Sequence, residues 1–337
     1  MGTPRANVGI RDVAQRAGVS VGTVSNVLNG SPRVSPVTVE RVRAAISDLG
    51  YVRNEAARQL RAGRSSSVGL VVLDVRNPFF TDVARGAEDE AARFGLSVIL
   101  GNSDEDVARE SSYLDLFEEQ RVHGILISPF GDIEDRLAEL RRRGTPVVLV
   151  DRESRDAAVS SVSVDDVAGG RLAVAHLLST GRRRIAFVGG PLGIRQISDR
   201  LAGARAAVAE VPGATLEELE TAALTVLEGR RVGEDLVART ERPDAVFAAN
   251  DLVAVGLLQA LVMSGRLRVP DDVALVGFDD IDFASATVVP LTSVRQPRHE
   301  IGATALRILR EEAAEPERPP RRIVFQPELV VRASTGA

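Results

Sequence analysis

Short apolar runs alternate with amphipathic helical stretches from residue 68 onward. Helical stretches such as 81–94, 106–121 and 251–263 separate the runs. This alternation is typical of parallel β-sheets with helices on both faces. The 273 residues that follow residue 64 exceed one comfortable core, so we expect two lobes. The strand-like runs are 68–73, 96–100, 124–128, 146–150, 185–189, 245–249 and 273–278.

Three short helices with a tight turn are predicted ahead of this region. Residues 10–18 carry apolar side chains at helical spacing, and Gly18 ends that helix. Ser20 is suited to cap a second helix over 21–29, and a third helix follows Ser35. This arrangement predicts a helix-turn-helix, whose second helix enters the major groove of DNA. The expected apolar stripe of the second helix is Val21, Val24, Val27 and Leu28.

Small polar residues occupy the outward face of the second helix. They leave room for a close approach to DNA. Asn26 can read adenine with two hydrogen bonds, and Val21 can contact a thymine methyl group. A three-helix module that binds protein is the alternative interpretation. The outward positions are Gly22, Thr23, Ser25, Asn26 and Asn29.

The first 64 residues are basic, although the whole chain is acidic. They contain ten arginines and four acidic residues, which gives a net charge of +6. The remaining 273 residues carry a net charge of -11, and the whole chain carries -5. A basic segment on an acidic chain favours binding to a polyanion such as DNA.

Several functions are excluded by residue types that the chain lacks. All 42 basic residues are arginine, so there is no P-loop lysine and no Schiff-base lysine. There is no cysteine for a thiol nucleophile, a disulfide or a zinc site. His123, His176 and His299 are too scattered for a local metal site. Residues 18–22 match G-x-S-x-G, but a helix and not a strand precedes the serine. We expect no enzyme, cofactor or metal.

No run approaches the 18 apolar residues that a membrane span needs, and no secretory signal is visible at the N-terminus. We therefore expect a cytoplasmic protein that makes no use of a membrane.

The segments DVAQRAGVSVGTVSNVLNG and RVSPVTVERVRAAISDLGYVRNEAARQLRAGRS resemble the DNA-binding region of the lactose-repressor (LacI/GalR) family. The resemblance implies a bacterial transcription regulator that binds a palindromic operator. It implies that Val21, Gly22 and Asn26 discriminate between operators. Other positions are those where the family contacts phosphates, fixes the helices or approaches DNA, namely Thr23, Ser25, Asn29, Arg33, Ser35 and Thr38.

Residues 54–63, NEAARQLRAG, have high helix propensity but form too short a run to be stable alone in water. They are either a linker with transient helicity or, by the resemblance, a hinge helix that folds on DNA. In the family reading Leu60 is the apolar wedge in the minor groove, and Asn54 and Ala57 face that groove.

The rest of the chain also resembles this family and the periplasmic sugar-binding proteins. Its matching phrases include NPFF (77–80), AANDLVAVG (248–256) and VALVGFDD (273–280). The implied fold is an all-α helix-turn-helix head with a hinge helix, followed by a two-lobed α/β body of two doubly wound parallel sheets. Crossovers are expected near 164, 291 and 322. The implied domains are 1–53, 54–67 and 68–337, with one lobe at 68–164 and 292–322 and the other at 165–291 and 323–337.

Polar residues at the carboxyl ends of predicted strands are the candidates for a ligand site. Asp151, Asn250 and Asp279 hold such positions. The alternative interpretation is that Asn250 is no more than the cap of helix 251–263 and Asp151 no more than the start of a turn. The resemblance adds Arg200, whose planar fork of donors suits vicinal hydroxyls, and Gln296. Phe79 and Phe80 can pack on the apolar face of a sugar or belong to the core.

These features together predict a ligand-responsive DNA-binding homodimer, a repressor of carbohydrate-utilisation genes with a small sugar as effector. A regulator that responds to a purine or another metabolite is the alternative. A sugar-binding protein or a sugar-metabolising enzyme is the rival from another class. The missing signal sequence argues against the first rival, and the missing acid–base constellation argues against the second.

The hinge interpretation predicts the effect of one substitution. Leu60→Ala should weaken specific operator binding strongly and leave non-specific binding nearly intact, because the wedge contributes only at the kinked site. Binding titrations with operator and random DNA at one salt concentration measure both affinities. Equal loss of both would exclude the wedge role.

Overall fold

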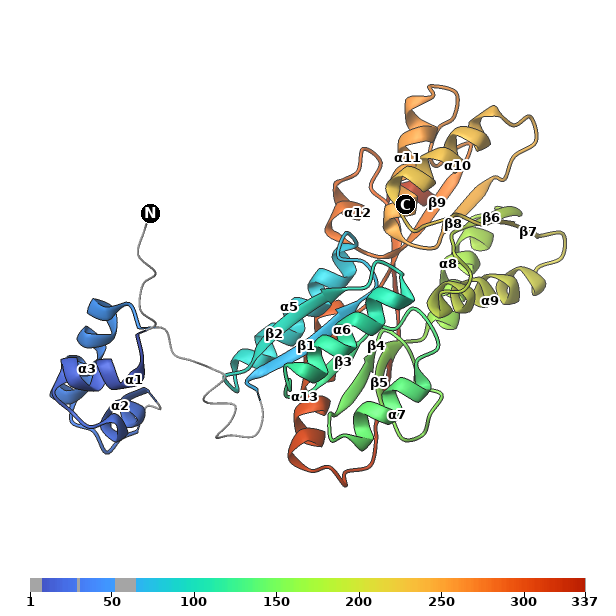
Figure 1. Ribbon diagram of the computed structural model, residues 1–337. Helices are drawn as coiled ribbons and strands as arrows, with labels where there is room; N and C mark the ends of the chain where they lie inside the picture. The colour runs from blue at the N-terminus through green and yellow to red at the C-terminus, as the bar shows by residue number, and fades with distance from the viewer. Residues whose placement is uncertain (1–7, 29–30, 52–64, 337) are drawn as a thin grey trace. The chain divides into compact units, whose positions relative to one another are not determined.

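The computed structural model describes residues 8–28, 31–51 and 65–336 (Figure 1). The chain divides into two compact units, residues 1–64 and 65–337. Four residues predicted to contact DNA lie outside the described residues, namely Asn29, Asn54, Ala57 and Leu60.

The first unit contains the three predicted helices, α1 (Ile10–Ala17), α2 (Val21–Leu28) and α3 (Pro36–Leu49). Gly18 takes a left-handed conformation with φ 62°, which ends α1 and starts the tight turn. The Ser20 hydroxyl accepts a hydrogen bond from the Thr23 backbone amide at 3.1 Å and so caps α2. A small core joins the three helices through Val13, Val24 and Val42.

One expectation about α2 is wrong. The helical spacing predicts that Val21 belongs to the apolar stripe, yet Val21 is 39% exposed. It is the first residue of α2, and the buried side of this helix consists of Val24 with the partly buried Val27 and Leu28. Val21 is thus free to contact another molecule.

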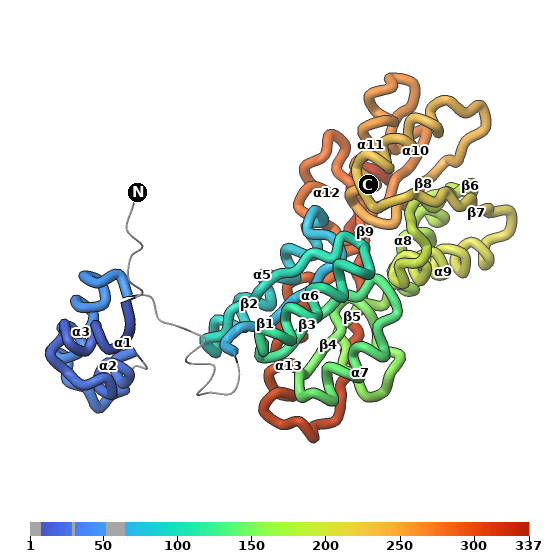
Figure 2. Tube along the Cα trace, viewed as in Figure 1, coloured from blue at the N-terminus to red at the C-terminus, as the bar shows by residue number. Residues whose placement is uncertain are grey.

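The second unit is built on two six-stranded sheets with helices on both faces (Figures 1 and 2). The first sheet has the order β11-β5-β4-β3-β1-β2 and defines the first lobe, and the second has the order β12-β10-β9-β8-β6-β7 and defines the second lobe. Among the described residues all strand pairs are parallel except β10 with β12. The first sheet consists of β1 (Ser67–Val72), β2 (Ser97–Asn102), β3 (Ile125–Ile127), β4 (Val147–Val150), β5 (Ser160–Val164) and β11 (Arg322–Phe325). The second consists of β6 (Arg184–Val188), β7 (Thr215–Leu219), β8 (Ala245–Ala248), β9 (Ala274–Asp279), β10 (Thr292–Arg295) and β12 (Glu328–Val330).

The helices of the second unit follow the strands in the alternating order that the sequence predicts. Within the described residues none of them is long and apolar enough to span a membrane. They are α5 (Pro78–Ala92), α6 (Val107–Glu119), α7 (Glu134–Arg142), α8 (Asp166–Ser179), α9 (Arg195–Ala209), α10 (Val226–Ala238), α11 (Asp251–Met263), α12 (Asp282–Ala286) and α13 (Arg298–Ala314). A short 3₁₀ turn, η1 (Ala333–Thr335), follows β12.

The chain crosses between the lobes three times. The first crossing follows β5, as expected near 164. The second lies at 296–297 and not near 291, because β10 pairs with β9 before α13 packs on the first lobe. The third lies at 326–327 and not near 322, because β11 pairs with β5.

Several strands escaped the sequence analysis. β5 has the sequence SSVSV, and all five residues are buried although three are serine. β7, with the sequence TLEEL, lies at the edge of its sheet and exposes its glutamates. Neither resembles a continuous apolar run, so the search for such runs could not find them.

Three pairs of helices approach so closely that glycine is required at each crossing. The pairs α5–α13, α8–α9 and α10–α11 run side by side (Figure 2). A Cβ atom added at Gly256 of α11 would lie 2.0 Å from the Val226 carbonyl oxygen, and one at Gly229 of α10 would lie 2.1 Å from the Val253 oxygen. The other two crossings have the same reciprocal arrangement. Gly86 of α5 and Gly302 of α13 each lie against the backbone of the other helix, as do Gly170 of α8 and Gly203 of α9.

We expect Gly256→Ala to lower the free energy of unfolding by about 1–3 kcal/mol, because the methyl group forces α10 and α11 apart. Gly193→Ala is the matched control, since no atom lies within 4 Å of a Cβ there. The control should change stability by less than about 1 kcal/mol. Thermal unfolding followed by circular dichroism compares the two variants. Equal stability of both variants would contradict the close-approach explanation.

Candidate functional site

A narrow cavity of about 30 Å³ lies where the two lobes meet. Residues of both lobes line it, and they sit at the carboxyl ends of strands or at the starts of the following helices. Six of the seven predicted effector residues are among the lining residues. These six are Phe79, Phe80, Asp151, Arg200, Asn250 and Asp279.

The two aromatic residues enter the cavity from the start of α5. Asn77 caps this helix by accepting a hydrogen bond from the Phe79 amide at 3.0 Å. The Phe79 and Phe80 rings meet edge to face, with centroids 5.0 Å apart. Both residues are buried and pack in the hydrophobic core, and both also line the cavity. The two interpretations of Phe79 and Phe80 therefore hold together.

Asp151 directly follows β4 and has a positive backbone φ of 59°. Asp279 is the last residue of β9 and has a positive φ of 103°. Such conformations are unfavourable for residues other than glycine and concentrate at functional sites. Asp151 accepts a hydrogen bond from Gln196 Nε2 at 2.9 Å. Asp279 accepts from Asn77 Nδ2 at 3.0 Å and from Gln296 Nε2 at 2.8 Å. The bonds from Gln196 and Asn77 join the two lobes.

Gln296, the seventh predicted residue, does not line the cavity. It lies behind Asp279 at the second crossover and orients that carboxylate. Burial raises the pKa of Asp279, and the nearby Arg200 charge opposes that rise. Burial, followed by the charge of Asp166, raises the pKa of Asp151 well above its ordinary value.

Arg200 on α9 is 4% exposed and supplies a buried positive charge to the cavity. Its Nη1 donates to the Ala249 carbonyl oxygen at 2.8 Å, and its guanidinium carbon lies 3.7 Å from the centroid of the Phe278 ring. Its Nη1 also lies 3.9 Å from Asp279 Oδ1. A guanidinium beside carboxylates can bind a ligand that both accepts and donates hydrogen bonds.

Asn250 has both of the roles considered for it. Its side-chain oxygen caps α11 by accepting from the Val253 amide at 2.9 Å. Its amide nitrogen donates to the Leu224 carbonyl oxygen at 3.4 Å, and the residue lines the cavity.

Sequence reasoning missed other polar residues of this site. Asn77 follows a strand in an Asn-Pro pair, a signal that a search of strand ends could have used. Gln196 lies in the first turn of α9, eight residues after β6 ends, so a search of strand ends does not reach it. Asp74 and Glu105 also line the cavity, and burial raises the pKa of Glu105.

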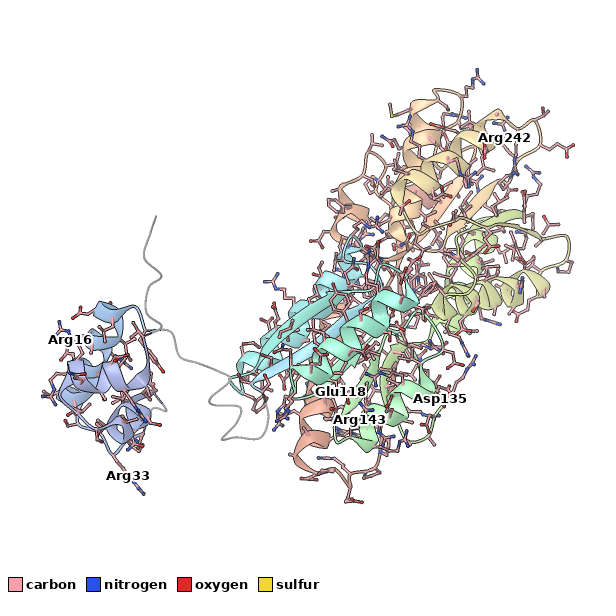
Figure 3. The ribbon with its side chains drawn as sticks, viewed as in Figure 1. Arg16, Arg33, Glu118, Asp135, Arg143 and Arg242 are labelled. Atoms are coloured by element: carbon pink, nitrogen blue, oxygen red, sulfur yellow. The ribbon has the colours of Figure 1, made fainter. Side chains whose placement is uncertain are left out.

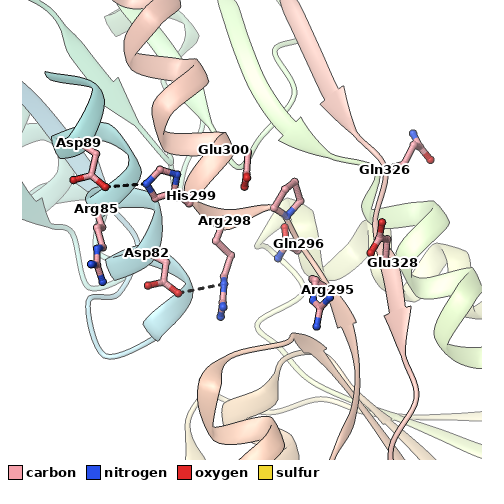
Figure 4. Close-up of a pocket in the computed structure, with 11 residues that line it drawn as sticks. Asp82, Arg85, Asp89, Arg295, Gln296, Arg298, His299, Glu300, Gln326 and Glu328 are labelled. Carbon is pink, nitrogen blue, oxygen red and sulfur yellow. Dashed lines mark hydrogen bonds and ion pairs between the residues drawn. The ribbon is translucent and has the colours of Figure 1, made fainter. Parts of the chain in front are cut away.

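A larger cavity of about 590 Å³ lies at the second and third crossovers (Figure 4). Four of its charged side chains form ion pairs with one another, Arg298 with Asp82 at 3.2 Å and His299 with Asp89 at 3.0 Å. Gln296 is the one predicted site residue that lines it. The convergence of buried polar groups therefore favours the small cavity as the ligand site. Within the described part of the chain no group of three or more His, Cys, Asp or Glu residues is arranged to hold a metal ion.

The first unit presents the remaining predicted DNA contacts at its surface. Val21, Gly22 and Asn26 are exposed on α2. Thr23 and Ser25 are half-buried, and the Thr23 hydroxyl lies 2.9 Å from the Ser20 hydroxyl. Arg33 extends from the first unit into solvent (Figure 3).

Comparison with known proteins identifies similar chains over the full length. The model of bacterial regulatory proteins of the lacI family matches residues 9–54, and that of a periplasmic binding protein-like domain matches residues 174–335. A ribose operon repressor of Halalkalibacterium halodurans is 35% identical over 330 residues, which cover 97% of this chain and 96% of that protein. The transcriptional repressor PurR of Photobacterium profundum is 32% identical over 96% of this chain and 98% of its own length.

Solved structures agree with this assignment. The lac repressor dimer bound to operator and the anti-inducer ONPF superposes with a TM-score of 0.85 at 28% identity. The match covers 98% of this chain and all of that chain, 100%. Sequence and fold thus agree along nearly the entire length, and the chain belongs to the LacI family of bacterial regulatory proteins.

Proposed function

We propose that this protein is a homodimeric repressor that binds a palindromic operator and changes its operator affinity when a small sugar binds between its lobes. The observation that carries the proposal is the cavity in which Asp151, Arg200, Asn250 and Asp279 converge beside two phenylalanine rings. A repressor of this kind acts on the bacterial chromosome, in the cytoplasm. The proposal gives the chain no catalytic role.

The chemistry of the cavity favours a monosaccharide. Arg200 and the two aspartates can bind vicinal hydroxyls, which both donate and accept hydrogen bonds. Phe79 and Phe80 can cover an apolar sugar face. The cavity is narrow, so a disaccharide would demand a much wider separation of the lobes than a pentose. The similarity to a ribose operon repressor makes D-ribose the first sugar to test.

A purine is the second candidate, because a PurR repressor is nearly as similar. The rings of Phe79 and Phe80 could stack on a purine as well as on a sugar. The three buried carboxyl groups near Arg200 are better matched to a ligand with several hydroxyl donors, which favours the sugar.

Hydrogen bonds across the cavity offer a way to couple sugar binding to lobe closure. Asn77 of the first lobe donates to Asp279 of the second, and Gln196 of the second lobe donates to Asp151 of the first. A sugar hydroxyl can replace either amide as the donor to these carboxylates. Sugar binding would then change the angle between the lobes and so the operator affinity, as reciprocal coupling requires.

The DNA-binding part of the proposal rests on the first unit. Its exposed residues Val21, Gly22 and Asn26 are placed to read bases, and Arg33 to approach the backbone. Thr23 and Ser25 lie beside them on α2. We extend the interface to Asn29, Asn54, Ala57 and Leu60 on the sequence alone.

Selection from random duplex DNA tests sequence-specific binding. The full-length protein is incubated with the DNA pool at a stated salt concentration, with and without D-ribose. Enrichment of one palindrome under either condition supports the proposal. Folded, dimeric protein that enriches no sequence under both conditions would refute it.

The cavity assignment predicts that Asp279→Ala separates the two activities. D-ribose affinity should fall by at least about 100-fold, because a buried charged acceptor for the sugar is lost. Operator binding without sugar should persist, because the predicted DNA contacts belong to the first unit, whereas Asp279 binds Asn77 and Gln296 of the second. Titration calorimetry and operator-binding titrations measure the two affinities.

Asp282→Ala is the matched control for Asp279→Ala. Asp282 lies three residues further along, and its side chain is 100% exposed. It should keep the sugar response of the wild type. A full ribose response in Asp279→Ala would show that the effector binds elsewhere. A wild-type protein that responds to a purine base but not to D-ribose would favour the purine alternative.

A further inference from the structure

Asp166 is a buried acid that none of the site predictions included. It is the first residue of α8, it is 7% exposed, and it does not line the cavity between the lobes. Its Oδ1 accepts a hydrogen bond from Arg200 Nε at 2.7 Å. The sequence analysis did not predict β5, the strand that ends two residues before Asp166. The search of strand ends therefore could not select Asp166.

The guanidinium of Arg200 is held in one orientation by three groups. Asp166 binds Nε, the Ala249 carbonyl oxygen binds Nη1, and the Phe278 ring lies against the flat face. Two points in the plane and one contact on its face fix the position of a planar group. Among the described residues none provides a hydrogen bond to Nη2, so that nitrogen can donate to a ligand.

Asp166 differs from the other two acids around Arg200. Asp151 accepts a hydrogen bond from Gln196, and Asp279 accepts from Asn77 and Gln296. No hydrogen bond joins either acid to Arg200. Asp279 Oδ1 lies 3.9 Å from Nη1, a distance at which only charge attraction acts. The direct hold on Arg200 therefore comes from Asp166.

We propose that Asp166 is a positioning residue for the effector: it fixes Arg200 for sugar binding as a carboxylate, so the affinity for the sugar falls when the protein is acidified. This inference rests on the proposed function, in which Arg200 binds the sugar. Asp166 acts through Arg200 and does not touch the sugar.

The titration of Asp166 falls in an experimentally convenient range. Burial raises the pKa of Asp166 to about 6, against the lowering effect of the Arg200 charge and hydrogen bond. The charged groups that face it are Arg200 and Asp199 of α9, Asp279 at the end of β9 and Asp151 after β4. Below this pH Asp166 is protonated, and its hydrogen bond to Arg200 loses the assistance of charge. Sugar affinity should therefore be high above pH 6 and lower below it.

Calorimetric titration of the full-length protein with D-ribose between pH 5 and pH 8 tests the inference. The wild-type affinity should fall about fivefold from pH 8 to pH 5, because one unit of pKa difference between free and bound protein gives a tenfold change only when the pH lies well below both values. Asp166→Asn keeps an acceptor for Nε but cannot ionise. Its affinity should be about tenfold weaker than wild type at pH 8 and should change by less than about threefold with pH.

Asp165→Asn is the control variant. Asp165 caps α8 by accepting from the Ala168 amide at 2.8 Å, and asparagine caps equally well. This variant should keep the wild-type affinity and the wild-type pH profile. A wild-type profile in Asp166→Asn, or a flat profile in Asp165→Asn, would overturn the inference.

A second measurement separates this inference from the proposed function, because it needs no sugar. In arginine-labelled protein the Arg200 Nε–H signal is assigned by its loss in Arg200→Lys. Asp166→Asn should speed the solvent exchange of this proton at least about tenfold, as expected for a weaker hydrogen bond. Unchanged exchange would overturn the positioning role. Faster exchange in a protein that binds no ribose would support the positioning role and refute the ribose effector.

Discussion

The second unit is organised around one buried arginine that must be compensated. A guanidinium removed from water is costly unless carboxylates and carbonyl groups surround it. Arg200 obtains these from four separate places in the chain: the start of α8, the end of β4, the end of β9 and the residue after β8. Each place belongs to a strand end or a helix start, so the parallel sheets are the structure that brings the compensating groups together.

This compensation brings together more acidic groups than one arginine can pair with. Three acids face Arg200, and burial raises the pKa values of all three. The amides of Asn77 and Gln296 donate to both oxygens of Asp279, and that of Gln196 donates to one oxygen of Asp151, whose other buried oxygen has no hydrogen-bond partner. A ligand rich in hydroxyl groups offers hydrogen-bond donors equivalent to these amides, and unlike them it can dissociate. The protein's own amides thus occupy the positions for which a sugar would compete.

Much of this architecture could be predicted from the sequence, and the failures have physical causes. Runs of Val, Ile, Leu and Phe marked the buried strands, and the rule on strand ends, with the family resemblance, selected Asp151, Arg200 and Asp279. The serine-rich β5 and the edge strand β7 were missed because neither is a continuous apolar run. Gln296 was placed in the cavity but lies behind it, since a contact between side chains depends on packing that no local pattern encodes.

The reciprocal glycine crossings bear on how movement spreads through the molecule. Each of the three crossings joins helices of the same lobe, and backbone lies directly against backbone there. Such contacts leave no flexible side chain to absorb a displacement, so each lobe should behave as a stiff lever. The crossovers are then the compliant joints. A shift of a few tenths of an ångström around the sugar becomes a larger displacement at the far end of the lever, where β1 begins and the chain enters the second unit.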